Sequence, residues 1–505
     1  MGGDAPLKRG EQIAQELEAR IVSCGWKVGQ RLGTEDDLAR EFGASRSIIR
    51  EAIAIAELDG FVESHRGQYG GLFVSAAAQV TRVATLRHYL ALAGATPEDV
   101  NAMRFTVEAQ VCELAMARIR ADEVGRLRDL VVLPPGEAPE DLAQHTNALL
   151  YEILRIAGHP GLSLFALTLA QGNIDIALWN GADEYDVLEL TRTVWGFRTR
   201  QVEAIIGGDL ANVLAMQRAI STAGLALHER FRSPPETVEL ALLRLSLLGL
   251  KYPLVGRVKV AKKPEAVARL IAQQIATQRL TLGARIGSES ELVEKYGVSR
   301  GVLREAVRWL ERHGVAKVLR GKEGGLHVVR PDPTAVVRAS SLYLASGSDR
   351  RAADFHAVAQ IQQLAAVDRA AARARCGDPA LGELIQDARA RLEAGLGADD
   401  EPDVTGLYSL LAEASGSPVI DCLMGAMIFP LRFLRRSAGS PEERDTFRRG
   451  QLRMIKAIEA GDAPLARRHV LELQALTAAF DPELLTAGDM VGQRVVTRRE
   501  PRPLA

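Results

Sequence analysis

Apolar residues recur at helical spacing over most of the chain. In the segment EQIAQELEARIV, Ile13, Leu17 and Ile21 stand four residues apart. The same spacing returns at Val267 and Ile271, and it places the apolar side chains on one face of an amphipathic helix. The segments FVESHRGQYGGLFV and VAKVLRGKEGGLHV instead carry apolar ends around a glycine-rich centre. They predict β-hairpins, because glycine tolerates the positive φ angles that tight turns need.

The chain contains one module twice. Residues 11–75 align without a gap on residues 265–329, at a constant offset of 254, and roughly a third of the aligned positions are identical. The offset is about half of the 505 residues. Self-similarity at one fixed spacing is the mark of a duplicated structural unit, so the length divides into two modules.

Both copies show the signals of a helix-turn-helix. In the second copy the helix after Ser288 begins with Ser288-x-x-Glu291, the pattern of a capping box. A glycine then supplies the turn, and Ser45 or Ser299 caps the next helix, SRSIIREAIAIAEL or SRGVLREAVRWLER. With the preceding helix and the following hairpin, each copy predicts a winged helix-turn-helix.

These segments resemble a known family. LGTEDDLAREFGASRSIIREAI and IGSESELVEKYGVSRGVLREAV are similar to the DNA-binding head of GntR-type bacterial transcription regulators. The stretches that follow, including MRFTVEAQVCELAMARI, ILRIAGHPGLSLF and LLAEASGSPVI, resemble the helical effector domain (FCD) of the FadR-like branch. The resemblance implies a regulator that binds double-stranded operator DNA and a small-molecule effector.

The expected fold is mainly α, with two winged helix-turn-helix domains that are each followed by an all-α helical bundle. The expected boundaries are 8–77 for the first DNA-binding domain, 80–231 for the first effector-binding domain, 232–262 for a linker, 263–331 for the second DNA-binding domain, 333–481 for the second effector-binding domain and 482–505 for a flexible tail.

Arginines mark the expected DNA-contacting face of each head. Arg46 and Arg50, like Arg300 and Arg304, stand four residues apart, so each pair shares one helix face. A pair of this kind is usually a solvated surface, but its repetition beside a capped turn and a glycine-rich wing favours contact with guanine or phosphate. The candidate DNA-binding residues are Ser45, Arg46, Arg50, Arg66 and Gly67 in the first head and Ser299, Arg300, Arg304, Arg308, Arg320, Gly321 and Lys322 in the second.

The two heads differ in charge. The whole chain has a formal net charge of -1, which excludes nucleic-acid binding through global positive charge. Residues 1–76 hold nine Lys+Arg and twelve Asp+Glu, whereas residues 255–330 hold sixteen and seven. Where GntR-type regulators often carry a phosphate-binding arginine, the first head has Asp36 and the second Ser290. The second head therefore carries most of the expected attraction to DNA.

The helical segments are expected to bind their effector without a metal. Many relatives hold a metal with histidines, but the corresponding positions here are Leu150, Arg198 and Ile220 in one module and Tyr408, Gln451 and Leu473 in the other. Asp141 and His145 have ligand spacing but lie out of register, as on a solvated helix face. No cofactor is expected. The candidate effector-binding residues are Arg104, Tyr151, Arg198 and Tyr408, and an acidic or acylated metabolite fits the resemblance.

Other features favour a cytoplasmic protein with no membrane partner. The four cysteines show no CxxC spacing and are interpreted as buried thiols in a reducing compartment. The N-terminal residues lack the apolar core of a signal peptide. No stretch approaches the ~20 apolar residues that a membrane-spanning helix needs.

Three functions remain in view. The favoured one is a ligand-responsive repressor in which one chain forms an internal pseudo-dimer, with a homodimer as a further possibility. The first alternative is a sequence-nonspecific architectural DNA-binding protein. The second is an enzyme housed in the helical domains, which is disfavoured because no Ser/His/Asp, Cys/His or metal cluster recurs in both halves.

We predict that Arg304→Ala weakens operator binding more than Arg50→Ala does. The reason is that the second head supplies most of the positive charge, and one lost bidentate arginine contact costs about 1–3 kcal/mol. Titrations of the two variants against the same duplex at fixed salt measure the difference. Equal losses would contradict the predicted asymmetry between the heads.

Overall fold

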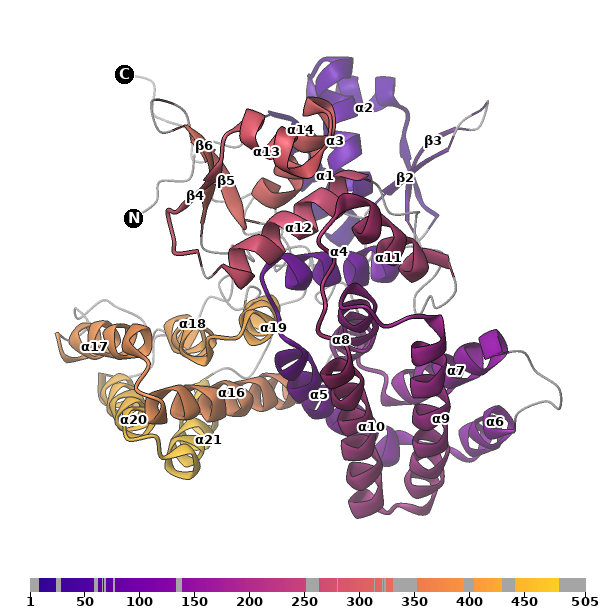
Figure 1. Cartoon of the computed structure of the whole chain (residues 1–505). Helices are drawn as coiled ribbons and strands as arrows, with labels where there is room; N and C mark the ends of the chain where they lie inside the picture. The colour runs from indigo at the N-terminus through magenta and orange to yellow at the C-terminus, as the bar shows by residue number, and fades with distance from the viewer. Residues whose placement is uncertain are drawn as a thin grey trace.

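The fold is mainly α-helical, with two small antiparallel sheets, as the sequence predicts (Figure 1). It is taken from a computed structural model of the 505-residue chain. The structure describes residues 9–23, 29–58, 62–65, 67, 70–75, 78–132, 139–250, 263–278, 280–312, 314–319, 321, 324–329, 352–394, 404–428 and 441–480. The expected tail, 482–505, and residues 333–351 of the second effector domain lie outside these ranges.

The two heads repeat the same elements in the same order. The first consists of α1 (Arg9–Ser23), β1 (Arg31–Gly33), α2 (Glu35–Phe42), α3 (Arg46–Leu58), β2 (Val62–His65) and β3 (Gly71–Val74). The second consists of α12 (Lys263–Thr277), β4 (Arg285–Gly287), α13 (Glu289–Tyr296), α14 (Arg300–Arg312), β5 (Ala316–Leu319) and β6 (Gly325–Val328). The predicted hairpins are β2–β3 and β5–β6, and in each head a third strand, β1 or β4, pairs with the second hairpin strand, which is central in the sheet.

Local capping sets the position of the helix-turn-helix in both heads. The Ser288 hydroxyl accepts from the backbone N–H of Glu291 at 3.3 Å, and the Glu291 carboxylate accepts from the N–H of Ser288 at 2.6 Å. This is the predicted capping box, and Thr34 with Asp37 forms the same one in the first head. Each second helix then ends at a glycine with a φ of 57° (Gly43) or 59° (the equivalent in the second head), a left-handed conformation that favours glycine.

Each helical domain follows its head along the chain. The first comprises α4 (Ala78–Leu92), α5 (Pro97–Arg118), α6 (Ala121–Val131), α7 (Pro139–Ala157), α8 (Pro160–Trp179), α9 (Glu184–Gly207) and α10 (Leu210–Arg230). The second comprises α16 (Ala352–Arg375), α17 (Pro379–Glu393), α18 (Val404–Ser415), α19 (Pro418–Ile428), α20 (Pro441–Glu459) and α21 (Ala463–Phe480). Figure 1 shows the heads in the upper half of the view and the helical domains below them.

The interval 232–262, expected to be a linker, contains a helix. Residues Val238–Leu250 form α11, which packs against α8 of the first helical domain and against α12 of the second head. Val238 and Ala241 are buried in this contact. The start of the apolar run VELALLRLSLLGL is therefore part of a packed interface, to which it contributes Val238 and Ala241.

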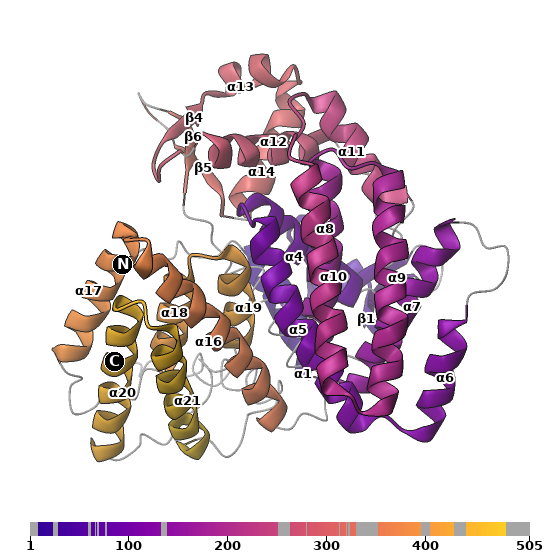
Figure 2. The same ribbon diagram turned by 60° about the horizontal axis from the view of Figure 1, so that its bottom comes forward.

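The two helical domains share one apolar core. A single cluster of buried residues includes Met103 and Val107 of the first domain together with Val358 and Leu423 of the second. Helix α5 contacts both α16 and α19, and Figure 2 shows these helices side by side. An ion pair of 2.6 Å between Asp99 and an arginine of α16, Arg369, also joins the domains. The first head instead has a buried cluster of its own, formed by residues between 13 and 74.

Two sequence expectations need correction. Residues Gly161–Trp179 of α8 have a mean hydropathy of 1.3, enough for a membrane span by length and composition, but 78% of the stretch is buried among other helices, as in the core helix of a folded domain. The cysteines were all expected to be buried. Cys112 and Cys422 are, whereas Cys376 is exposed because it lies in the turn between α16 and α17, and Cys24 lies outside the described residues.

Candidate nucleic-acid interface and ligand cavity

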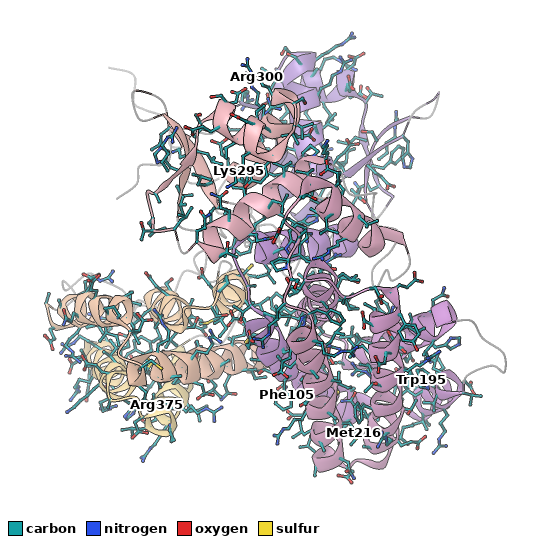
Figure 3. The ribbon with its side chains drawn as sticks, in the orientation of Figure 1. Phe105, Trp195, Met216, Lys295, Arg300 and Arg375 are labelled. Atoms are coloured by element: carbon teal, nitrogen blue, oxygen red, sulfur yellow. The ribbon has the colours of Figure 1, made fainter. Side chains whose placement is uncertain are left out.

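The third helix of each head has one apolar face and one arginine face. In α3 the buried residues Ile49, Ala52 and Ile53 anchor the helix, and in α14 the anchors are Leu303, Ala306 and Leu310. The predicted arginines Arg46, Arg50, Arg300, Arg304 and Arg308 are all exposed. Figure 3 shows Arg300 at the outer edge of the second head. Each helix is thus held from behind and presents cations outward, as a recognition helix requires.

The predicted serines begin these helices. The Ser45 hydroxyl accepts from the backbone N–H of Ile48 at 3.5 Å, and the Ser299 hydroxyl accepts from that of Val302 at 3.3 Å. Both serines are exposed. The N-terminus of a recognition helix combines free N–H groups with the positive end of the helix dipole, which suits contact with phosphate.

In the first head, carboxylates of α2 engage both arginines of α3. The Arg46 guanidinium donates to the two carboxylate oxygens of Asp36 at 2.7 and 3.0 Å. The Arg50 Nε donates to Glu35 at 2.8 Å. All four side chains are exposed, so these pairs contribute little to stability, but they place negative charge beside the surface that DNA would approach.

The second head retains only one of these pairs. Arg304 lies 3.1 Å from Glu289, the counterpart of Glu35. Ser290 replaces Asp36, and the described residues offer Arg300 no carboxylate within ion-pair distance. Arg308 adds a third exposed cation one turn further along α14. The structure therefore extends the charge difference between the heads to the recognition helices themselves.

Three predicted wing residues, Arg66, Arg320 and Lys322, lie outside the described residues. Gly67 and Gly321 are exposed at corresponding points of the two wings, with φ angles of 115° and 114°. This backbone conformation is open to glycine and strained for other residues, which explains why both copies keep glycine there.

The first helical domain contains a partly open cavity of about 60 Å³. It is lined by Arg104, Ala143, Thr146, Asn147, Leu150, Ala170, Asn173, Ile174, Leu190, Thr191, Val194 and Arg198. These residues come from α5, α7, α8 and α9. Apolar walls with a few convergent polar groups are typical of small-molecule sites.

A buried charge network forms one side of this cavity. Glu108 accepts from Arg104 Nε at 2.7 Å, from Arg198 Nη2 at 2.9 Å and from Gln217 at 2.8 Å. Burial alone would raise the pKa of Glu108, but the two arginines outweigh it and lower that pKa to about 2. Two buried cations thus share one carboxylate, and the Nε of Arg198 has no hydrogen-bond partner among the described residues. The unbalanced positive charge is suited to an anion.

The second helical domain lacks these charges at the matching positions. Buried positions of α5 recur in α16 255 residues later, so that Met103 corresponds to Val358 and Cys112 to Val367. In this register Ala359 replaces Arg104 and Gln363 replaces Glu108. The glycine-aspartate pairs at 208–209 and 461–462 likewise align Gln451 with Arg198. The two helical domains have therefore diverged in the chemistry of their interiors.

The other predicted effector residues do not line the cavity. Tyr151 is partly exposed on α7, and Tyr408 is buried in the core of the second helical domain. Among the described residues, no group of three or more His, Cys, Asp and Glu side chains is close enough to hold a metal ion. Glu108 and Gln217 were not among the residues predicted from the sequence. The spacing of Arg104 and Glu108, four apart on one helix, was a signal for the first, whereas Gln217 lies 109 positions beyond Glu108 and gave none.

Comparison with known proteins agrees with the geometry of the heads. The model of the gntR family of bacterial regulatory proteins matches residues 9–74 and 263–324. The putative HTH-type transcriptional regulator RmpR of Mycobacterium gastri is 27% identical over 199 residues, which cover 37% of this chain and 72% of that protein. The Exu regulon transcriptional regulator of Escherichia coli is 26% identical over 132 residues, 26% of this chain and half of the relative's length. A solved structure of Streptococcus agalactiae GntR matches 44% of this chain and 99% of its own, at 20% identity and a TM-score of 0.26.

We predict that Asp36→Ser strengthens DNA binding and that the reciprocal Ser290→Asp weakens it, each by roughly threefold to tenfold. Asp36→Ser frees Arg46 for phosphate and removes a negative charge, whereas Ser290→Asp gives Arg300 a carboxylate partner. Fluorescence-anisotropy titrations over a series of salt concentrations measure both effects. The slope of log affinity against log salt should steepen by about 1 for Asp36→Ser and flatten by about 1 for Ser290→Asp.

The reciprocal design supplies its own control. Both substitutions change one exposed residue in the first turn of a capped helix and leave the capping pair intact. Shifts in the same direction, or unchanged salt slopes, would contradict the proposed effect of charge at this position.

Proposed function

This chain belongs to the GntR family of DNA-binding transcriptional regulators, and we propose that it acts as a ligand-responsive repressor built as a single-chain pseudo-dimer. In this proposal, two unequal heads contact one operator and a small organic anion in the first helical domain sets their affinity for DNA. The relatives are transcription regulators, and the chain is not an enzyme.

The apolar core shared by the two helical domains is the observation that supports an internal pseudo-dimer. The domains contact through α5, α16 and α19, and Asp99 and Arg369 form an ion pair across the contact. Joining the two modules in one chain makes their association intramolecular and so independent of protein concentration. Two such chains could pair in turn, and the size of the free protein in solution tests this.

Unequal heads imply an unequal operator. Residues 255–330 hold sixteen basic residues, and in the recognition helix of this second head Arg300 and Arg308 have no carboxylate partner in the described part of the chain. We therefore expect it to bind the stronger half-site and the first head to bind a weaker one, about one helical turn away. The candidate contacts are the predicted serines and arginines of α3 and α14 and the wing residues.

The cavity of the first helical domain supports an anionic effector. Arg104 and Arg198 bring two positive charges to a buried site that contains one balancing carboxylate, Glu108. A carboxylate ligand would accept a hydrogen bond from the unpartnered Nε–H of Arg198 and neutralise the excess positive charge. A volume of about 60 Å³ admits only a compact molecule, unless the helices around it separate.

Selection of bound genomic DNA by the full chain, followed by footprinting, tests the regulator directly. We expect recovery of a small set of promoter-proximal fragments, with a pseudo-palindromic footprint and discrimination of about 10³ or more against random DNA. Comparable affinity for random and selected fragments would favour the architectural alternative. The protein is expected to act in the cytoplasm, where bacterial operators are accessible.

We predict that Arg198→Gln abolishes stabilisation by anionic effectors. A thermal-shift screen of the full chain against small carboxylates identifies ligands, because a ligand at about 100 times its Kd adds about 2.7 kcal/mol to the free energy of unfolding. Glutamine is the residue at the corresponding position of the second helical domain, so the substitution removes charge while keeping a side chain found there. The matched control is Gln451→Ala, which should leave the shift unchanged. An unchanged shift in Arg198→Gln would exclude this cavity as the anion site.

A further inference from the structure

The second head packs on the first helical domain, which belongs to the other copy of the module. Helix α12 contacts α4 and α11, and Figure 1 shows it beside them. One buried apolar cluster contains Leu178 and Val187 of the first helical domain together with Val267, Ile271 and Leu310 of the second head. The first head has no such shared cluster among the described residues.

Polar and aromatic contacts fix the position of the docked head. His88 of α4 lies 3.2 Å from the Glu265 carboxylate of α12, and its ring lies 5.2 Å from the ring of Trp309. Arg269 pairs with Glu265 at 3.3 Å, and its guanidinium lies 5.8 Å from the ring of Trp179 on α8. Trp309 belongs to the recognition helix, on the side opposite Arg300 and its neighbours. The docking contact therefore reaches the back of the helix that presents the arginines.

Glu265 keeps its charge inside this interface. Burial alone would raise its pKa, but the hydrogen bond from His88 and the positive charges of Arg269 and Arg87 lower it to about 2. Arg87 in turn forms a buried ion pair with Asp175 of α8. Separating the head from α4 would break the contact between Glu265 and His88 and expose the shared apolar cluster to water, which is unfavourable. The interface therefore favours one defined docked position over a range of loose ones.

The first head keeps the counterpart of Glu265, Glu11, but lacks two other residues that dock the second head. Gln15 stands where the second head has Arg269, and Ile55 stands where it has Trp309. Neither replacement can supply the cation or the indole ring that this contact uses. The difference explains why one copy packs on the first helical domain and the other keeps a separate core.

Helix α8 connects the cavity with the docked head. Asn173 and Ile174 line the cavity, the next residue is the Asp175 that holds Arg87, and Leu178 and Trp179 reach the second head one turn later. A ligand that moves α8 against its neighbours would therefore also move the surface on which α12 rests. Packed helices transmit such shifts because the interior has no spare volume to absorb them.

We propose that the cavity of the first helical domain regulates the second head. Sensing and strong DNA binding are thus divided between the two copies, and the signal passes across the docking contact of α12 with α4 and α8. This proposal rests on the proposed function, because it takes the charged cavity as the effector site and the second head as the main DNA-binding one.

Hydrogen exchange in the full chain tests the connection without DNA or ligand. The pocket variant is Arg198→Gln, and the docking variant combines Arg269→Gln with Trp309→Ile, the residues that the first head carries. We expect the pocket variant to change exchange in α12 and α14 about fivefold or more, and under about twofold once the docking variant is also present. Exchange in α1 and α3 should stay unchanged throughout.

A second pocket variant and a control show whether a change in exchange comes from the cavity or only from a loss of stability. Ala170→Leu adds volume at the cavity wall without removing charge and should affect the same two helices, whereas Gln451→Ala in the second helical domain should not. Circular dichroism confirms that each variant is folded. Equal exchange changes with and without the docking variant, or changes in α1 and α3 in place of α12 and α14, would overturn the proposal.

DNA titration separates this proposal from the proposed function. The chains compared are the unchanged chain, Arg198→Gln, the docking variant, and the chain that combines Arg198→Gln with the docking variant. If both hold, Arg198→Gln shifts the Kd for the selected operator about fivefold or more, and the docking variant removes that shift. If the chain shows no preference for any DNA while the exchange coupling persists, the proposed function fails and the connection stands. If Arg198→Gln changes operator binding equally with and without the docking substitutions, the proposed connection between the cavity and the second head is wrong, while the proposed function stands.

Discussion

Apolar burial across domain boundaries is the interaction on which this structure depends. Fully burying a leucine, isoleucine or valine side chain contributes about 1.5–3 kcal/mol, and the second head buries Val267 and Ile271 in a cluster that also contains Leu178 and Val187 of the first helical domain. A second shared core joins the two helical domains. Because this force has no preferred direction, the polar contacts at Glu265 and Asp99 are what select one arrangement of the joined domains.

Duplication followed by divergence explains the distribution of charge. The two heads share their capping boxes, their turn glycines and their wings, all of which the fold needs. They differ at Asp36 and Ser290, an exposed position whose charge matters little for folding but changes the expected attraction to DNA phosphates. The helical domains show the same separation, since the buried pattern of α5 recurs in α16 while Glu108 becomes Gln363. Residues that hold the backbone have been kept, whereas the charges at Asp36 and Glu108 have not.

The sequence predicts what is local and repeated. Capping residues, turn glycines and apolar spacing identify both heads, because these signals act within a few residues of one another. The arginines of the recognition helices follow from the same spacing. Contacts between distant segments leave no such trace: the packing of α11 inside the expected linker, the pairing of Glu108 with Gln217 and the docking of α12 on α4 all depend on tertiary structure. Tyr151 and Tyr408 were also candidate effector-binding residues, and they do not line the cavity.

Carrying both heads on one chain changes which substitutions evolution can try. In a symmetric dimer of identical subunits, every mutation in a recognition helix alters both half-sites at once, so the recognised DNA stays symmetric. Here the codon for Asp36 and the codon for Ser290 mutate separately. One head can lose affinity, or acquire a new base preference, while the other preserves enough binding to keep the target under control. A tandem chain can therefore reach asymmetric targets by single steps that remain functional.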